Sequence, residues 1–236
     1  MRRLKTRIHK YILGVLLLCI AAACTEPEGD KLTTPLELTV ERVEPDSVVM
    51  HCLALDFQVV DFFKWKSAFD QNDSLRKAFG LRSWHIFRKV LDTNQVLVMM
   101  KVTDVDKASA YSTDPEVTAQ MKDMGVVGVS SVKILNAIHL EDKTQSENLI
   151  LIQHEVEDYK AWAMSFEDAM STNENIGIKA LCRLYVLDNP NMVSVLLEVS
   201  SFELAEQIMS SPTNISSMKE SGAISEPIIT MLTFIE

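Results

Sequence analysis

Residues 154–162 read His-Glu-Val-Glu-Asp-Tyr-Lys-Ala-Trp, and residues 57–65 read Phe-Gln-Val-Val-Asp-Phe-Phe-Lys-Trp. The two stretches lie 97 residues apart and share a valine, an aspartate and a tryptophan at equivalent places. Extending this offset aligns residues 52–139 with 149–236 without a gap, and 17 of the 88 aligned pairs are identical. Self-similarity at a fixed offset indicates that the chain contains two copies of one domain.

Each copy has the pattern strand, helix, strand, strand, helix, strand. An apolar run of strand length opens each copy, and a helix with apolar side chains at helical spacing follows it. Asp61 and Asp158 are the predicted N-caps of these helices. Pro115 and Pro212 are predicted to begin a further helical segment in each copy. This order predicts an α+β fold made of two ferredoxin-like βαββαβ repeats.

Several motifs of the second copy resemble a known superfamily. Residues 154–162, the turn Asp188-Asn-Pro-Asn191 and the segment Met218-Lys-Glu-Ser-Gly222 are similar to the small bacterial cyclase-like proteins of the dimeric α+β barrels, which also include the antibiotic-biosynthesis monooxygenases. The first copy departs from the pattern at Phe57, where a histidine is missing. The resemblance implies that both repeats close into one intrachain pseudo-dimeric barrel, with helices outside and a lumen between the sheets.

The beginning of the chain is typical of an exported lipoprotein. Five basic residues precede an apolar run over residues 11–23, which is too short to span a membrane. The run ends in Ala21-Ala-Ala-Cys24, which resembles the lipobox of bacterial lipoproteins. We therefore expect cleavage after residue 23 and lipidation of Cys24, the alternative being an ordinary signal peptide with an incidental cysteine.

The predicted domains are a signal peptide (1–23), the lipidated cysteine with a flexible tether (24–45), repeat 1 (46–142) and repeat 2 (146–236). The tether is polar, acidic and contains two prolines. The full chain has a net charge of −10, and the mature chain would carry 18 basic against 33 acidic side chains. This balance argues against nucleic acid as a partner.

The localisation and the partners follow from the anchor. We expect a monomeric pseudo-dimer of the bacterial cell envelope that is held through Cys24 on the outer membrane. Of the cysteines that remain, Cys52 and Cys182 are predicted to be two buried thiols rather than a disulfide. No Cys/His cluster has zinc spacing, and no metal or cofactor is expected.

Strand alternation predicts which side chains face the lumen. In the second strand of repeat 2 the wholly apolar set Ala180, Cys182, Leu184 and Val186 is assigned to the helix-facing side. The residues that alternate with them, and the equivalent residues of repeat 1, then face the lumen. This gives the predicted ligand residues of the lumen: Trp84, Arg88, Lys179, Arg183 and Tyr185. Cations and aromatic rings that converge on one pocket favour a planar, anionic ligand. The alternative is that these charges pair internally, for example Arg183 with Glu198, or reach solvent at the mouth of the barrel.

The histidines and the other tryptophans have simpler interpretations. His154 is expected to have a structural role on the face it shares with Ile150 and Ile152, such as a hydrogen bond to a backbone group. Trp65 and Trp162 are predicted core residues, since they recur at helical spacing with phenylalanines. No Ser/His/Asp or Cys/His pattern of a nucleophile is present in the sequence.

The sequence therefore favours a lipoprotein that binds a small hydrophobic or anionic molecule, or a partner, in the barrel lumen. A cofactor-independent monooxygenase or a cyclase-like enzyme is the alternative, and catalytic residues are not assigned.

Overall fold

The computed structural model describes residues 49–139, 146–173 and 177–235. The predicted signal peptide, Cys24 and the tether lie outside these residues. Repeat 1 consists of β1 (Val49–Val59), α1 (Phe62–Gln71), α2 (Asp73–Ala78), β2 (Leu81–Lys89), β3 (Gln95–Val102), α3 (Val105–Tyr111), α4 (Pro115–Asp123) and β4 (Val126–His139). Repeat 2 consists of β5 (Asn148–Glu155), α5 (Tyr159–Asn173), β6 (Ile178–Val186), β7 (Asn189–Val199), α6 (Phe202–Met209), α7 (Pro212–Glu220) and β8 (Ile228–Phe234).

The strands form one closed, antiparallel barrel in the order β1-β3-β2-β8-β5-β7-β6-β4. Each repeat supplies four neighbouring strands in the ferredoxin-like order. The two sheets join where β2 pairs with β8, from Phe87 to Lys89, and where β4 pairs with β6, from Leu135 to His139. Closure removes most of the sheet edges that two separate ferredoxin-like units would expose. The predicted intrachain barrel is therefore confirmed.

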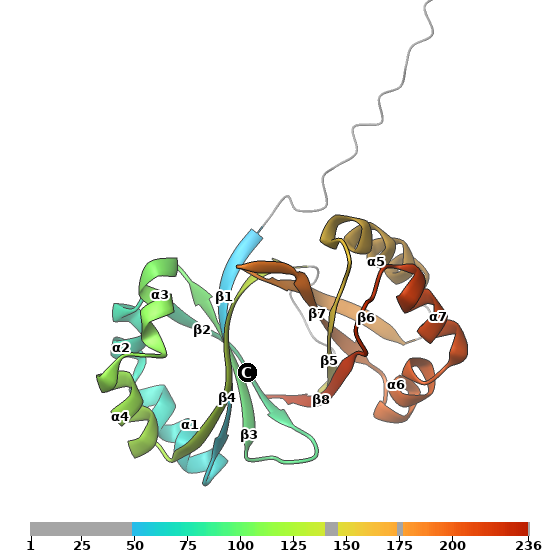
Figure 1. Ribbon diagram of the computed structural model, residues 1–236. Coiled ribbons are helices and arrows are strands. Elements are labelled where there is room, and N and C mark those ends of the chain that lie inside the picture. Colours follow the sequence, from blue (N-terminus) through green and yellow to red (C-terminus); the bar gives the residue numbers. More distant parts are fainter. Residues whose placement is uncertain (1–48, 140–145, 174–176, 236) are drawn as a thin grey trace, which may run out of the picture. The chain divides into compact units, whose positions relative to one another are not determined.

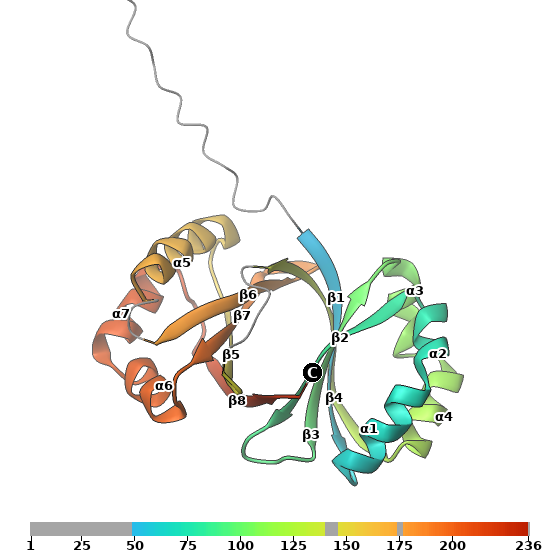
Figure 2. The same ribbon diagram turned by 180° about the vertical axis from the view of Figure 1, so that it is seen from behind.

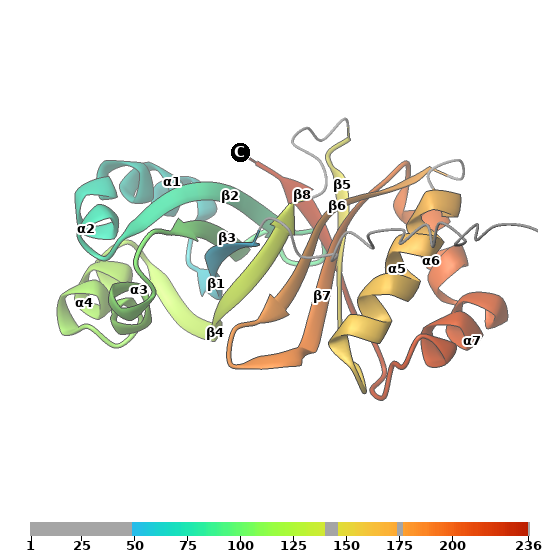
Figure 3. The same ribbon diagram turned by 90° about the horizontal axis from the view of Figure 1, so that it is seen from above.

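Two helical layers flank the strands, as Figures 1 and 2 show from opposite sides. Helices α1–α4 cover the sheet of repeat 1, and α5–α7 cover the sheet of repeat 2, which is also visible from above in Figure 3. Three apolar clusters result, one under each helical layer and a third on the lumen side of the sheets. Within the described residues, no helix is both long and apolar enough to cross a bilayer.

The helix starts follow the predicted capping chemistry. The carboxylate of Asp61 accepts a hydrogen bond from the backbone N–H of Lys64 at 2.9 Å, and Asp158 accepts one from Ala161 at 2.8 Å. Pro115 and Pro212 occupy the first turns of α4 and α7. These caps satisfy donors that the helix itself leaves without partners.

The two repeats share a β-bulge at equivalent places in β2 and β6, which the alternation of the sequence does not reveal. The pairing of β2 with β3 shifts between Ser83 and His85, and the pairing of β6 with β7 shifts between Ala180 and Cys182. The inserted residues, Trp84 and Leu181, lie 97 positions apart and are thus equivalent in the two repeats. Because a bulge adds one residue to the strand, every later side chain changes to the opposite face.

This reversal corrects the predicted lumen. Cys182, Leu184 and Val186 belong to the lumen cluster or pack against it, whereas they were expected under the helices. Arg183 and Tyr185 lie under the helices instead of in the lumen. Arg88 follows the bulge of β2 and is likewise on the helix side.

The contacts of these three residues confirm the correction. The Arg183 guanidinium is fully buried and donates to the carbonyl of Ala163 at 3.2 Å and to Glu167 at 2.9 Å. The Tyr185 ring lies 4.3 Å from the Tyr159 ring of α5. Arg88 stacks over the Phe62 ring of α1 at 4.2 Å. The expected internal pairing of Arg183 therefore exists, but with Glu167 in place of Glu198.

Both cysteines are buried and free, as predicted. They lie on the lumen side, where burial raises the pKa of the Cys52 and Cys182 thiols. A thiol that is kept protonated in an apolar surrounding is a poor nucleophile, so we assign both a packing role.

Candidate functional site

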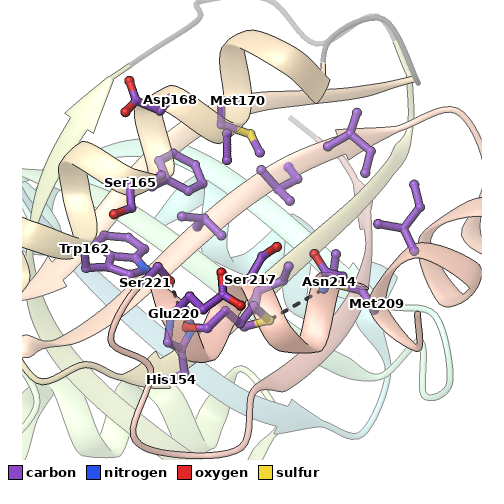
Figure 4. Close-up of a pocket in the computed structure, with 18 residues that line it drawn as sticks. His154, Trp162, Ser165, Asp168, Met170, Met209, Asn214, Ser217, Glu220 and Ser221 are labelled. Atoms are coloured by element: carbon purple, nitrogen blue, oxygen red, sulfur yellow. Dashed lines mark hydrogen bonds between the residues drawn. The ribbon is translucent and has the colours of Figure 1, made fainter. Parts of the chain in front are cut away.

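A cavity of about 390 Å³ lies in repeat 2 between its sheet and its helices (Figure 4). The sheet contributes residues of β5, β6 and β7 to the lining, and the other walls come from α5, α6 and α7. Most lining side chains are apolar: Ile152, Trp162, Phe166, Met170, Ile178, Val195, Leu197, Ile208, Met209 and Met218. This volume and this lining are typical of a small-molecule site.

His154 is the buried polar residue of the sheet wall. It lies near the end of β5 on the same face as Ile152, and it is only 5% exposed. Neither ring nitrogen has a hydrogen-bond partner among the described residues, so the expected hydrogen bond of His154 to a backbone group is not formed there. Leaving a buried polar group without a partner costs roughly 1–3 kcal/mol. The histidine therefore destabilises the fold unless another molecule pairs with its ring nitrogens.

The electrostatic state of His154 follows from this burial. Removal from water disfavours the charged imidazolium and lowers the pKa of His154. The ring is therefore neutral at pH 7, with one nitrogen as a donor and the other as an acceptor. A ligand with a hydroxyl or carbonyl group could pair with it.

Helix α5 supplies the aromatic wall. The Asp158 cap begins the helix and brings Trp162 one turn later against the sheet. The Trp162 ring is edge-on to the His154 ring at 5.7 Å and stacks with Phe166 at 5.4 Å. The Trp162 ring therefore packs against the histidine without offering its nitrogens a hydrogen bond.

Helix α7 and its C-cap add several polar residues to the lining. The Asn214 amide lies 3.6 Å from the Met218 sulfur and 3.9 Å from the Met209 sulfur, so it joins α6 and α7 at the cavity. The Ser221 hydroxyl donates to the carbonyl of Met218 at 2.8 Å. Ser217 and Glu220 also line the cavity on this side, as labelled in Figure 4.

The charge of the lining selects against anions. Asp168 and Glu220 are its two ionisable acids, and none of its described residues is a lysine or arginine. With a neutral His154, the site lacks a cation that could pair with a carboxylate or phosphate. Among the described residues, no group of three or more His, Cys, Asp or Glu side chains is arranged to hold a metal ion.

None of the five predicted ligand residues lines this cavity. Trp84 packs against the lumen cluster, and Lys179 precedes the bulge of β6 and keeps the lumen side. Arg88, Arg183 and Tyr185 lie under the helices but outside the cavity lining. Ligand binding by Trp84 and Lys179 stays a prediction.

The sequence contained a signal for the cavity in the differences between the repeats. His154 replaces Phe57, Asn214 replaces Val117 and Ser221 replaces Met124 at equivalent positions. Three polar side chains thus occupy places that are apolar in the other copy. Only the folded chain shows that these three places surround one space.

Comparisons with known proteins agree with the fold. No protein-family profile and no curated protein sequence matches the chain. A monooxygenase-like protein from Lactobacillus acidophilus superposes with a TM-score of 0.52 at 14% identity, covering 79% of this chain and 93% of its own. An anthrone oxidase-like protein superposes with a TM-score of 0.54 at 11% identity, covering 82% of this chain and 94% of its own. A chlorite dismutase-like protein superposes with a TM-score of 0.53 at 13% identity, covering 80% of this chain and 96% of its own.

These neighbours match over nearly their whole length, and at these identities the likeness shows a common fold alone. The chain therefore has the fold of the monooxygenase-like dimeric α+β barrel proteins, with both halves of the barrel on one polypeptide.

Proposed function

We propose that this protein is a lipid-anchored protein of the bacterial cell envelope that binds a small, largely apolar molecule in repeat 2. The binding site is the cavity between the sheet and α5–α7, with His154 as its polar anchor. Cys24 holds the protein on the outer membrane. This proposal moves the ligand from the lumen, where the sequence placed it, to the helix side of the sheet.

The observation that carries the proposal is the unpaired His154 in the cavity wall. Buried polar side chains almost always have a hydrogen-bond partner, and an exception needs a reason such as a ligand. Phe57 fills the equivalent place in repeat 1, so the fold itself does not require a histidine there.

The chemistry of the lining defines the class of ligand. Aromatic rings and three thioethers offer an adaptable apolar surface, and a neutral imidazole can pair with one hydroxyl or carbonyl. The carboxylates of Asp168 and Glu220 disfavour an anion. We expect a neutral or cationic molecule with a single polar group that reaches His154.

Native mass spectrometry of the purified protein tests the proposal, with release and identification of any bound molecule. The matched variant His154→Phe introduces the residue of repeat 1 and should keep the fold while losing the bound mass. Asn214→Val is a second variant of the same kind. A bound molecule that is retained by His154→Phe would show that the cavity is not the site.

Anchoring is tested separately. Replacing Cys24 by alanine should abolish acyl labelling and move the protein from the detergent phase to the aqueous phase, since stable membrane binding depends on the acyl chains. An unchanged detergent-phase fraction would contradict lipidation of Cys24.

A second candidate function is a cofactor-independent oxygenase, favoured by the neutral state of His154. A neutral imidazole next to an apolar cavity can accept a proton from an activated C–H or O–H group of a bound aromatic. Anthrone is a suitable probe, because its oxidation to anthraquinone consumes one dioxygen and releases water. Oxygen uptake that is lost in His154→Phe would support the enzyme, and equal rates in both proteins would exclude this base.

A further inference from the structure

Two cations face each other at the end of the barrel where β1 begins. Arg82 of β2 and Lys101 of β3 are direct cross-strand partners, and Lys101 in turn pairs with Cys52, close to the start of β1. Directly opposite residues of antiparallel strands project to the same face, and like charges in such positions repel each other. The pair therefore destabilises the sheet locally.

No acidic side chain compensates this pair within the described part of the chain. Arg82 and Lys101 are both exposed, and neither forms an ion pair with a described residue. The Lys101 ammonium lies 5.6 Å from the centre of the Trp84 ring. Trp84 itself is the bulged residue that packs against the lumen cluster. In a chain with a net charge of −10, two adjacent cations that lack an acidic partner among the described residues are unexpected, and one of them lies beside an aromatic ring.

Repeat 2 shows that the fold does not require this arrangement. Lys179 and Glu198 occupy the equivalent positions and are also direct cross-strand partners, but with opposite charges. Leu181 stands in the place of Trp84. The like-charged pair and its tryptophan are thus particular to repeat 1.

We infer that Arg82, Lys101 and Trp84 form a second binding site, for an organic anion with a flat apolar part. A carboxylate between the two cations would remove their repulsion and accept charge-assisted hydrogen bonds from both. The apolar part would lie against the ring of Trp84. This site is independent of the cavity beneath α5–α7, whose lining disfavours anions, and the two proposals can fail separately.

Calorimetric titration of the full chain in a nonionic detergent with 2-naphthoate tests the inference. Lys101→Glu introduces the residue of repeat 2 and should weaken binding by about tenfold or more, since a charge-assisted contact is replaced by repulsion. The same variant should melt at an equal or higher temperature, because it converts a repulsive pair into an attractive one. Lys101→Met should weaken binding to a smaller extent.

Lys122→Glu on α4 is the control, because it changes the net charge equally at a distant place and should leave the affinity unchanged. The neutral analogue 2-naphthylmethanol should bind much more weakly than 2-naphthoate. Equal affinity of the native protein and Lys101→Glu would overturn the site, and so would the absence of any 2-naphthoate binding. Lys101-dependent binding to phosphatidylglycerol vesicles without 2-naphthoate binding would also overturn it, in favour of a lipid headgroup.

Discussion

The two repeats have the same fold but fill the space beneath their helices differently. In repeat 1 the Phe57 and Trp65 rings meet edge-on at 5.3 Å, and both side chains are 1% exposed. In repeat 2 the equivalent pair is His154 and Trp162, which border the cavity. One copy of the duplicated domain thus has a tightly packed core, whereas the other has a polar group and free volume at the same place.

The helices account for part of this difference. Repeat 1 has the short helix α2, which brings the buried Arg76 over the Phe69 ring at 3.8 Å. Its guanidinium donates to the carbonyl of Phe69 at 2.6 Å. In repeat 2 the first helix continues to Asn173 instead. The comparison teaches that duplication allows one copy to keep the barrel stable while the other carries a costly site.

The largest expected effect concerns the two tryptophans. Trp65→Ala should destabilise the protein by about 3–5 kcal/mol, as expected for a large side chain in a packed core. Trp162→Ala should cost less, because this ring already borders free volume. Denaturant unfolding of both variants measures the difference, and a larger loss for Trp162→Ala would contradict the assignment of the packed and the open repeat.

Replacing His154 or Phe57 by its equivalent from the other repeat should change the stability of the protein in opposite directions. His154→Phe should stabilise the protein by roughly 1–3 kcal/mol, because it removes a buried polar group without a partner. Phe57→His should destabilise it by a similar or larger amount. The test is the midpoint of urea unfolding without added ligand. Destabilisation by both exchanges would show that His154 is needed for packing.

The pH dependence of stability should differ between the native protein and His154→Phe. Burial lowers the pKa of His154 in the folded state, so the unfolded chain binds the proton more readily. The native protein should therefore lose stability as the pH falls below about 6.5, the ordinary histidine pKa, toward the lower folded value. His154→Phe should lose less over this range. Identical pH profiles of the two proteins would refute the neutral, buried state of His154.

The smallest expected effect is the loss of a helix N-cap, which should cost the same stability in both repeats. Asp61→Ala and Asp158→Ala each remove an N-cap and should each cost about 1 kcal/mol. Thermal unfolding of both variants provides the measurement. Clearly unequal losses would show that the two helix starts are not equivalent, although their capping bonds are alike.

Much of the fold could be predicted from the sequence, because its signals are local and repeated. The offset between the copies, the caps at Asp61 and Asp158, and the helical spacing of Trp65 and Trp162 all agree with one arrangement. The burial of both free cysteines also followed from their apolar neighbours. The placement of Arg88, Arg183 and Tyr185 was wrong, because the alternation was followed through a bulge.

The sequence alone determined that the chain is duplicated and which elements each copy forms. These properties depend on period, capping and repetition, which are readable residue by residue, whereas the closure of the two copies into a barrel was implied only by the resemblance to the dimeric α+β barrels. Only the tertiary structure decided which face of β2 and β6 lies in the lumen, since a bulge is set by pairing with the neighbouring strand. It also decided where free volume remains, because His154, Trp162 and Asn214 come from separate elements that meet only in the folded chain.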